Sequence, residues 1–183
     1  AHPGIDLNLK NKSGCSALDI AVGERYCNVI ELLVTHPKLD IELIRANIYP
    51  ILHLAASQGS TDLIKLLLDL PDTDPNVVDA YGTSALHIAV ASFCGGFEIR
   101  TKLLLEHPKT DPNLTDIRGK SALHIAVHYN RGDIVKLLLK HSKIDPNLPD
   151  AYGNSALLIA MRLHHREIVN MLRCHSKICN RRN

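Results

Sequence analysis

The sequence predicts an all-α solenoid of stacked helix-turn-helix units with short β-turn fingers. An apolar motif returns five times at a nearly constant interval, and each copy contains two segments with the spacing of an amphipathic helix. Between the copies stand Asp, Pro, Asn and Gly at fixed offsets, which is typical of tight turns. One helix pair cannot bury its apolar stripe alone, so the units are expected to stack around one continuous core.

The repeat is defined by near copies of the string S-A-L-H-I-A-V. The central leucines lie 34, 34, 37 and 34 residues apart, so the third unit carries three extra residues. A second apolar string of the type V-K-L-L-L follows the first at a constant offset, except at this insertion. The five central leucines are Leu18, Leu52, Leu86, Leu123 and Leu157.

The first string of each unit predicts a helix that begins after a serine. A serine hydroxyl can accept a hydrogen bond from the free N–H groups of the first turn. The second string predicts an antiparallel helix of about ten residues with an apolar stripe and solvated lysines. The predicted capping serines are Ser16, Ser84, Ser121 and Ser155.

The turns between units contain D-P-N and then D-A-Y-G or D-I-R-G, where Gly supplies a positive φ. The full pattern D-x-x-G-x-S-A-L-H-I-A-V, followed by L-L-L, resembles the ankyrin repeat. The resemblance covers essentially the whole chain, with Ser-Ala in place of Thr-Pro. In the second unit Arg45 and Ile48 replace the turn Asp and Gly, and Pro50 replaces the serine. We therefore expect an irregular turn between the first two units.

On this reading, residues 1–183 form a single ankyrin-repeat domain. His2-Pro3, followed by Asp6 and Asn8, matches the tail of a preceding unit. At the other end Arg173 replaces a stripe leucine, and the residues from His175 onward are expected to begin another loop, so a C-terminal cap and a truncated array remain alternatives. The approximate repeats are 11–44, 45–78, 79–115, 116–149 and 150–183, with 1–10 as the tail of a preceding repeat.

Composition narrows the class of protein. The chain is 45% apolar and 22% charged with a net charge of +2, which is an ordinary globular balance and too neutral for general nucleic-acid binding. The sequence contains no run of 18 apolar residues, which is the length that would predict a membrane-spanning helix. Five irregularly spaced cysteines fit a reducing compartment better than a disulfide framework. We expect an intracellular protein, cytoplasmic or nuclear, or one delivered into a host cell if it comes from a pathogen.

No constellation of residues predicts catalysis or a cofactor. Gly119-Lys120-Ser121 resembles the end of a phosphate-binding loop, but Leu114 stands where the first glycine is required. The local cluster His164-His165, Cys174, His175 and Cys179 has no recognised metal-ligand spacing, so solvated loop and helix-end residues are the favoured interpretation. We expect no enzyme activity, no cofactor and no metal.

Histidines recur once per repeat unit. Packed helices lie about 8–10 Å apart, whereas a zinc ion must lie about 2 Å from each ligand atom, so histidines of successive units are too far apart to share a metal. The resemblance implies instead that the motif histidine ties the turns together by hydrogen bonds. In this sequence the motif histidines, to which the resemblance assigns that role, are His53, His87 and His124. Asp19 and Leu158 stand at this position in the first and fifth units.

The resemblance also implies that the finger tips and the exposed side of the first helices bind a partner. Mapped onto this chain, that surface has 25 positions and holds four of the five tyrosines. Tyrosine and arginine are enriched in interface hot spots. The alternative is that tyrosine simply fits a turn position before glycine, as at Tyr81 and Tyr152. The surface has a formal charge of +3, which favours a partner with acidic or aromatic segments. The candidate binding residues are Tyr49, Tyr81, Thr83, Arg118, Lys120, His128, Tyr129, Tyr152, Asn154 and Arg162.

The insertion at 93–97 contains both phenylalanines of the chain. Phe97 is expected to extend the second helix inward, whereas Phe93 could lie in the core or on the surface. The function predicted overall is a non-enzymatic adaptor or scaffold, monomeric by itself, that binds a protein or peptide rather than nucleic acid or membrane. The alternative is the targeting or substrate-recruitment region of a larger enzyme or secreted effector.

Overall fold

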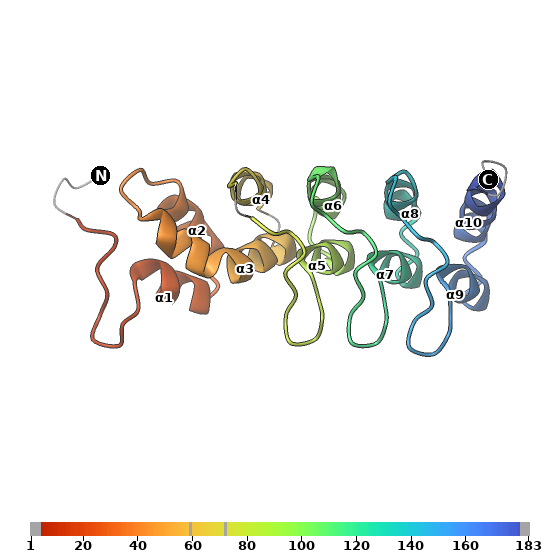
Figure 1. Ribbon diagram of the computed structural model, residues 1–183, viewed down its shortest axis with the longest axis horizontal. Helices are drawn as coiled ribbons and strands as arrows, with labels where there is room; N and C mark the ends of the chain where they lie inside the picture. Colours follow the sequence, from red (N-terminus) through yellow and green to blue (C-terminus); the bar gives the residue numbers. More distant parts are fainter. Residues whose placement is uncertain (1–4, 59, 72, 180–183) are drawn as a thin grey trace.

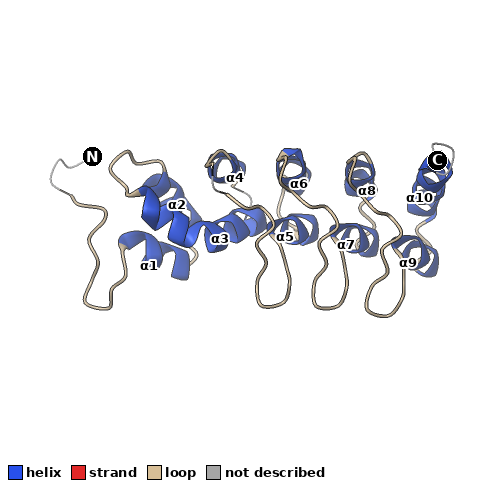
Figure 2. Cartoon of the chain, in the orientation of Figure 1, coloured by secondary structure: helices blue, strands red, loops and turns tan. Residues whose placement is uncertain are grey.

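The computed structural model describes residues 5–58, 60–71 and 73–179, with side chains up to His175. Within this part of the chain, helices form two stacked rows joined by loops (Figures 1 and 2). The first row contains α1 (Ala17–Gly23), α3 (Ile41–Gln58), α5 (Ala85–Ala91), α7 (Ala122–His128) and α9 (Ala156–Arg162). The second row contains α2 (Cys27–Val34), α4 (Thr61–Leu68), α6 (Phe97–Glu106), α8 (Gly132–Leu139) and α10 (Arg166–Cys179). The predicted helical solenoid is confirmed.

Serines precede four of the first-row helices, α1, α5, α7 and α9, as the sequence predicts. The hydroxyls of Ser16, Ser84 and Ser155 each accept a hydrogen bond from the backbone N–H three residues later. Ser121 contributes to the start of α7 through its own backbone N–H, which donates to Nδ1 of His124 at 3.1 Å. These bonds satisfy groups that a helix end would otherwise leave unpaired, so each helix begins at a fixed residue.

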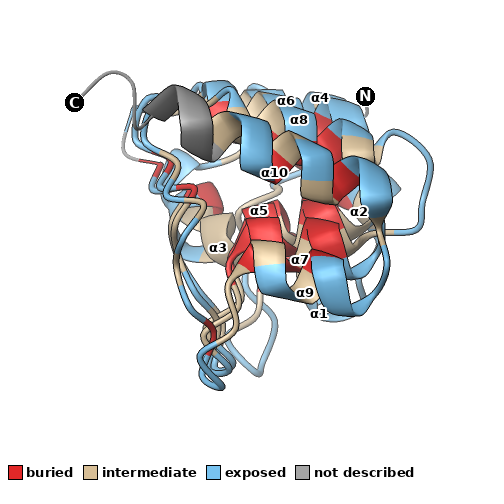
Figure 3. Ribbon diagram, turned by 90° about the vertical axis from the view of Figure 1, so that its right-hand side faces the viewer, coloured by how far each residue is buried: buried red, intermediate tan, exposed pale blue. Residues whose placement is uncertain are grey.

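The core lies between the two rows and runs through all the units. Small residues on the first-row helices allow the close approach: Ala55, Ala89, Ala126 and Ala160 are all fully buried. Leucine and isoleucine stripes of the second row pack against them. Viewed along the stack, the buried residues of the two rows face one another and the outer surfaces are exposed (Figure 3). The units therefore share one interior, as a solenoid requires.

The connection between the first two units departs from the sequence prediction of an irregular turn. The finger is absent, because α3 continues through residues 41–58 as one helix of 18 residues that includes Pro50. Without the turn Asp and Gly, residues 41–49 carry no signal that ends a helix, and they include the strong helix formers Glu42, Leu43, Arg45 and Ala46. Residues 44 and 45, the expected boundary between two repeats, both lie inside α3.

The three-residue insertion forms the loop at 92–96 and leads into α6. As expected, Phe97 begins this helix and packs against the core. Of the two placements expected for Phe93, the structure has the surface one, with 78% of its area exposed. Arg100 is fully buried at the position that Leu63, Ile134 and Ile168 occupy in other units.

The Arg100 guanidinium holds the inserted loop in place. It donates to the carbonyl oxygens of Gly95 at 2.7 Å and Cys94 at 3.2 Å, and to the hydroxyl of Ser92 at 3.0 Å. Burial lowers the pKa of Arg100. Because these three acceptors lie within and beside the insertion, the arginine stabilises a loop that no other unit has.

The two ends of the described chain differ from each other. Asn8 accepts from the backbone N–H of Asp40 at 2.8 Å and donates to the carbonyl of Lys38 at 3.0 Å, which is the link that Asn76 and Asn113 make between later units. Residues near Asn8 thus pack like the tail of a repeat, whereas His2 and Pro3 lie outside the described residues. At the other end α10 continues to Cys179, so the expectation of a loop from His175 onward is wrong.

Among the residues described, no helix combines the length and the hydropathy needed to cross a bilayer.

Candidate functional site

Three fingers of nearly identical construction project between α4 and α5, between α6 and α7, and between α8 and α9 (Figure 1). In the first, Oδ1 of Asp79 accepts from the backbone N–H groups of Tyr81 and Thr83, both at 2.8 Å. Asp116 and Asp150 make the same pair of bonds in the second and third fingers. The residue two positions after each aspartate is exposed at the finger tip. These residues are Tyr81, Arg118 and Tyr152.

Backbone hydrogen bonds join each finger to the next. The N–H of Ile117 donates to the carbonyl of Tyr81 at 3.0 Å, and the N–H of Ala151 donates to that of Arg118 at 2.9 Å. The fingers approach so closely at Gly119 that a Cβ there would lie 2.5 Å from the Ala151 nitrogen. The finger tips are therefore a connected, preorganised row rather than three independent loops.

The motif histidines lock each finger to the next unit, as the resemblance implies. Nε2 of His87 lies 3.0 Å from the carbonyl oxygen of Lys120, and Nε2 of His124 lies 3.2 Å from that of Asn154. Nδ1 of each ring accepts from a backbone N–H, so Nε2 carries the proton and the ring is neutral. His53 differs, because its Nε2 lies 3.3 Å from the carbonyl oxygen of Val77, at the base of the finger, and not against Thr83, which is the counterpart of Lys120 and Asn154.

These histidines make stability depend on pH. Burial lowers the pKa of His87 and His124 below the ordinary value, so between the two values the unfolded chain binds protons that the folded chain does not. We expect the free energy of unfolding to fall as the pH drops below about 6.5, by up to about 1.4 kcal/mol per pH unit for each histidine. Urea unfolding at about pH 7.5, 6.5 and 5.5 measures this slope.

Single variants identify the source of the slope. His87→Gln and His124→Gln should each flatten it, because each variant lacks one of the two buried imidazoles. A free energy of unfolding that stays constant over this pH range would contradict the neutral, buried assignment.

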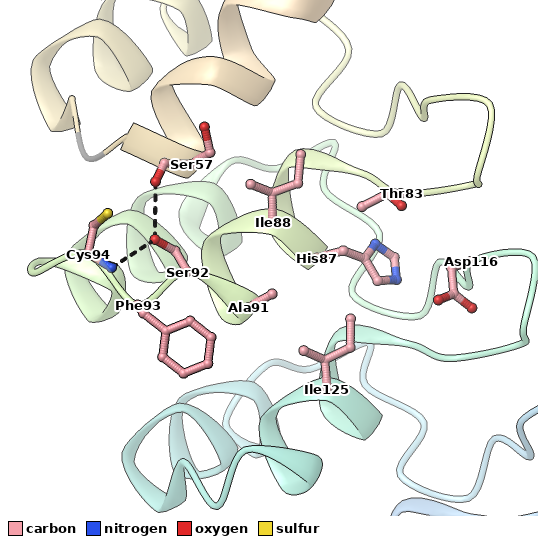
Figure 4. Close-up of a pocket in the computed structure, with 10 residues that line it drawn as sticks. All are labelled: Ser57, Thr83, His87, Ile88, Ala91, Ser92, Phe93, Cys94, Asp116 and Ile125. Carbon is pink, nitrogen blue, oxygen red and sulfur yellow. Dashed lines mark hydrogen bonds between the residues drawn. The ribbon is translucent and has the colours of Figure 1, made fainter.

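A largely apolar pocket of about 480 Å³ lies beside the fingers (Figure 4). Ile88 and Ala91 of α5 and Ile125 of α7 line its floor, and Phe93 of the inserted loop stands at one end. Thr83 and Asp116 of two neighbouring fingers line the other end (Figure 4). We call this hollow the apolar pocket.

A second hollow of about 350 Å³, the basic pocket, lies one unit further along, between α7 and α9. Lys120, His128 and Arg162 line it together with Tyr152 and Asn154. The one carboxylate that lines it, that of Asp150, already accepts hydrogen bonds from the backbone N–H groups of Tyr152 and Asn154. Burial raises the pKa of that carboxyl, but hydrogen bonds from the backbone and side chain of Asn154 and the backbone of Tyr152 outweigh burial and hold the pKa below its ordinary value.

The structure brings most of the candidate binding residues to one surface. The basic pocket gathers five of them, Thr83 lines the apolar pocket, and Tyr81 and Arg118 stand on finger tips. Tyr129 lies at the end of α7, in edge contact with His128. Tyr49 differs from the rest, because it is half-buried within α3, where its ring lies 4.5 Å from that of His53. The five in the basic pocket are Lys120, His128, Tyr152, Asn154 and Arg162.

Sequence reasoning missed the cluster that holds Phe93. The Arg131 guanidinium lies 4.2 Å from the ring centre of Phe97, 5.1 Å from that of Phe93 and 5.8 Å from that of Tyr129. It also donates to the carbonyl of Val90 at 2.9 Å. Phe93 and Tyr129 meet edge to face at 5.2 Å. The only sequence signal for this cluster was that both phenylalanines occur in the insertion. That signal could not identify Arg131 as the residue they contact.

The described residues contain no group of three or more His, Cys, Asp or Glu side chains placed to hold a metal. Of the local cluster considered from the sequence, the side chain of Cys179 lies outside the described residues. Gly119-Lys120-Ser121 forms the end of the second finger, with Gly119 at a φ of +70°. The arrangement of this surface is suited to binding through shape, hydrogen bonds and charge.

Comparison with known proteins adds one match. The family model for ankyrin repeats (3 copies) matches residues 42–116 and 91–183. A search of curated proteins found no match.

Proposed function

The chain belongs to the ankyrin-repeat family, and we propose that it is a non-enzymatic adaptor or scaffold that holds a partner protein or peptide against its fingers and first-row helices. Repeats of this family generally mediate protein–protein interactions. The observation that carries the proposal is the pair of adjacent pockets beside three fingers that are hydrogen-bonded to one another. A preformed surface lowers the entropy cost of ordering a bound segment.

The proposal places the protein in a reducing intracellular compartment, the cytoplasm or the nucleus. Cys94 and Cys174 are exposed free thiols, and such thiols persist where the redox buffer keeps them reduced. The module is proposed to act as a monomer.

Quantitative capture from a cell lysate tests the proposed surface. A variant with four alanines at exposed positions should retain its thermal unfolding midpoint and lose most of the partners captured by the parent, because aromatic and arginine side chains dominate binding energy. The replaced residues are Tyr81, Arg118, Tyr129 and Tyr152.

A matched control carries four alanines at exposed positions of the second-row helices and should capture the same partners as the parent. Those positions are Lys65, Glu98, Lys136 and Asn170. If the finger variant and this control retain the same set of partners, the proposed surface is wrong.

A further inference from the structure

We propose that the two pockets together bind an extended acidic peptide, in which one bulky apolar side chain fills the apolar pocket and a carboxylate three residues away occupies the basic pocket. This inference rests on the proposed function and specifies the chemistry of the partner. It is carried by the contents of the two pockets, by the contacts that hold Phe93 and by the spacing of the units.

The apolar pocket has the composition of a site for a single anchoring side chain. Ile88, Ala91 and Ile125 provide an aliphatic floor, and the exposed ring of Phe93 adds an aromatic wall. The pocket is an open hollow, so it covers one side of the group that it holds and does not enclose it. An apolar side chain of the partner gains more there than a polar one, because the floor offers few hydrogen-bonding groups.

Phe93 is exposed and yet held in place. Its ring lies against Tyr129, and the Arg131 guanidinium that it contacts is fixed by the bond to Val90. The loop that carries Phe93 is itself held by Arg100. An exposed aromatic ring that is already ordered loses little entropy on binding, so it is suited to act as an anchor.

The basic pocket has unmatched positive charge. Within the part of the chain that the structure describes, neither Lys120 nor Arg162 forms an ion pair, although Arg162 donates to Oδ1 of Asn154 at 3.3 Å. Asp150 accepts hydrogen bonds from the backbone N–H groups of Tyr152 and Asn154, so its carboxylate is directed into the finger. A partner carboxylate would therefore meet two cations and the imidazole of His128.

The spacing of the units sets the spacing of the peptide side chains. Ile88 and Ile125 of the apolar pocket belong to α5 and α7, and His128 and Arg162 of the basic pocket belong to α7 and α9, so the pockets are about one unit apart. Packed helices lie about 8–10 Å apart. A peptide in the extended polyproline II conformation rises about 3.1 Å per residue and has three residues per turn, so side chains three residues apart lie on the same face at a spacing of about 9 Å.

Titration of the isotope-labelled protein by NMR tests the inference with one defined probe. The probe is an acetylated and amidated peptide, Glu-Ser-Ser-Phe-Ser-Ser-Glu, which offers a carboxylate on either side of the aromatic ring. We expect resonances of Phe93, Ile125 and Arg162 to shift on titration. Replacing both Glu by Gln should weaken binding by about fivefold or more, because the paired charges are lost.

Protein variants distinguish the two pockets. Phe93→Ala should weaken binding by about tenfold, and its effect should be the same for the Glu and the Gln peptides. The double variant Lys120→Gln, Arg162→Gln should remove the preference for Glu over Gln and the dependence on salt. The matched control Lys102→Gln, Lys136→Gln removes the same total charge from α6 and α8. It should alter neither the preference for the Glu peptide nor the dependence of binding on salt.

Three results would overturn the inference: no shift of these resonances at millimolar peptide, equal affinity for the Glu and Gln peptides, or tighter binding of a single-stranded oligonucleotide to the same residues. Its failure can be separated from failure of the proposed function. If the finger variant loses its lysate partners while the peptide does not bind, the surface stands and the assigned peptide chemistry is wrong.

Discussion

Gly119→Ala is expected to lower the free energy of unfolding by about 3 kcal/mol or more, as measured by urea unfolding. Gly119 has a φ of +70°, which costs an L side chain about 1–2 kcal/mol. Its Cβ would also lie 2.5 Å from the backbone nitrogen of Ala151 and 2.9 Å from the carbonyl carbon of Asp150. Backbone atoms of the next finger cannot move away without breaking the Arg118–Ala151 hydrogen bond, so overpacking adds about 1–3 kcal/mol.

Gly153→Ala is the matched control in the last finger. Gly153 has a φ of +78°, but a Cβ there would meet nothing within 4 Å. It should therefore incur only the conformational cost of about 1–2 kcal/mol. Equal losses in the two variants would show that contact between fingers does not limit stability, and would contradict the connected row of finger tips.

The sequence was sufficient to predict the features that all the units share. Each capping serine and each turn aspartate occurs at the same offset in several copies, so a weak local preference is reinforced by its repetition. The resemblance to the ankyrin repeat implied that Tyr81, Arg118 and Tyr152 lie at the finger tips, and the structure has them exposed there. A local signal that agrees with the global pattern specifies a structure reliably.

The sequence failed where a unit departs from its copies. Ile48 at the position of the turn glycine indicated an irregular turn, because a β-branched residue resists a positive φ, but α3 continues through the expected finger. The stretch from His175 onward resembles the start of an inter-repeat loop, but it lacks the D-P-N turn that follows in other units, and α10 continues through it.

The insertion was the least predictable part of the site. Arg100 stands where an apolar stripe residue is expected, and no other unit supplies a copy that could reveal its role. The contact of Arg131 with Phe93 brings together side chains from adjacent units, and its geometry depends on a loop of unique sequence. The apolar pocket follows from this loop, so its composition could be expected only after the fold was known.

Ile134→Ala is expected to lower the free energy of unfolding by about 3–4 kcal/mol, because it opens a cavity in a fully buried site. Ile168→Ala should cost a similar amount, since α8 covers Ile168 as α6 covers Ile134. Val29→Ala, at the same position of the first unit, should cost only about 0.5–1 kcal/mol, because Val29 is 44% exposed where no preceding helix pair is described.

This series measures directly what a neighbouring unit contributes. The three positions have the same place in the second helix of their repeats, so the covering unit is the main variable once the one carbon fewer that Val29→Ala removes, about 0.8 kcal/mol, is taken into account. Urea unfolding of the three variants, each compared with the parent, gives the free energies. If Val29→Ala proved as costly as Ile134→Ala, each helix pair would be stable through its own contacts, and stacking between units could not be the source of the core.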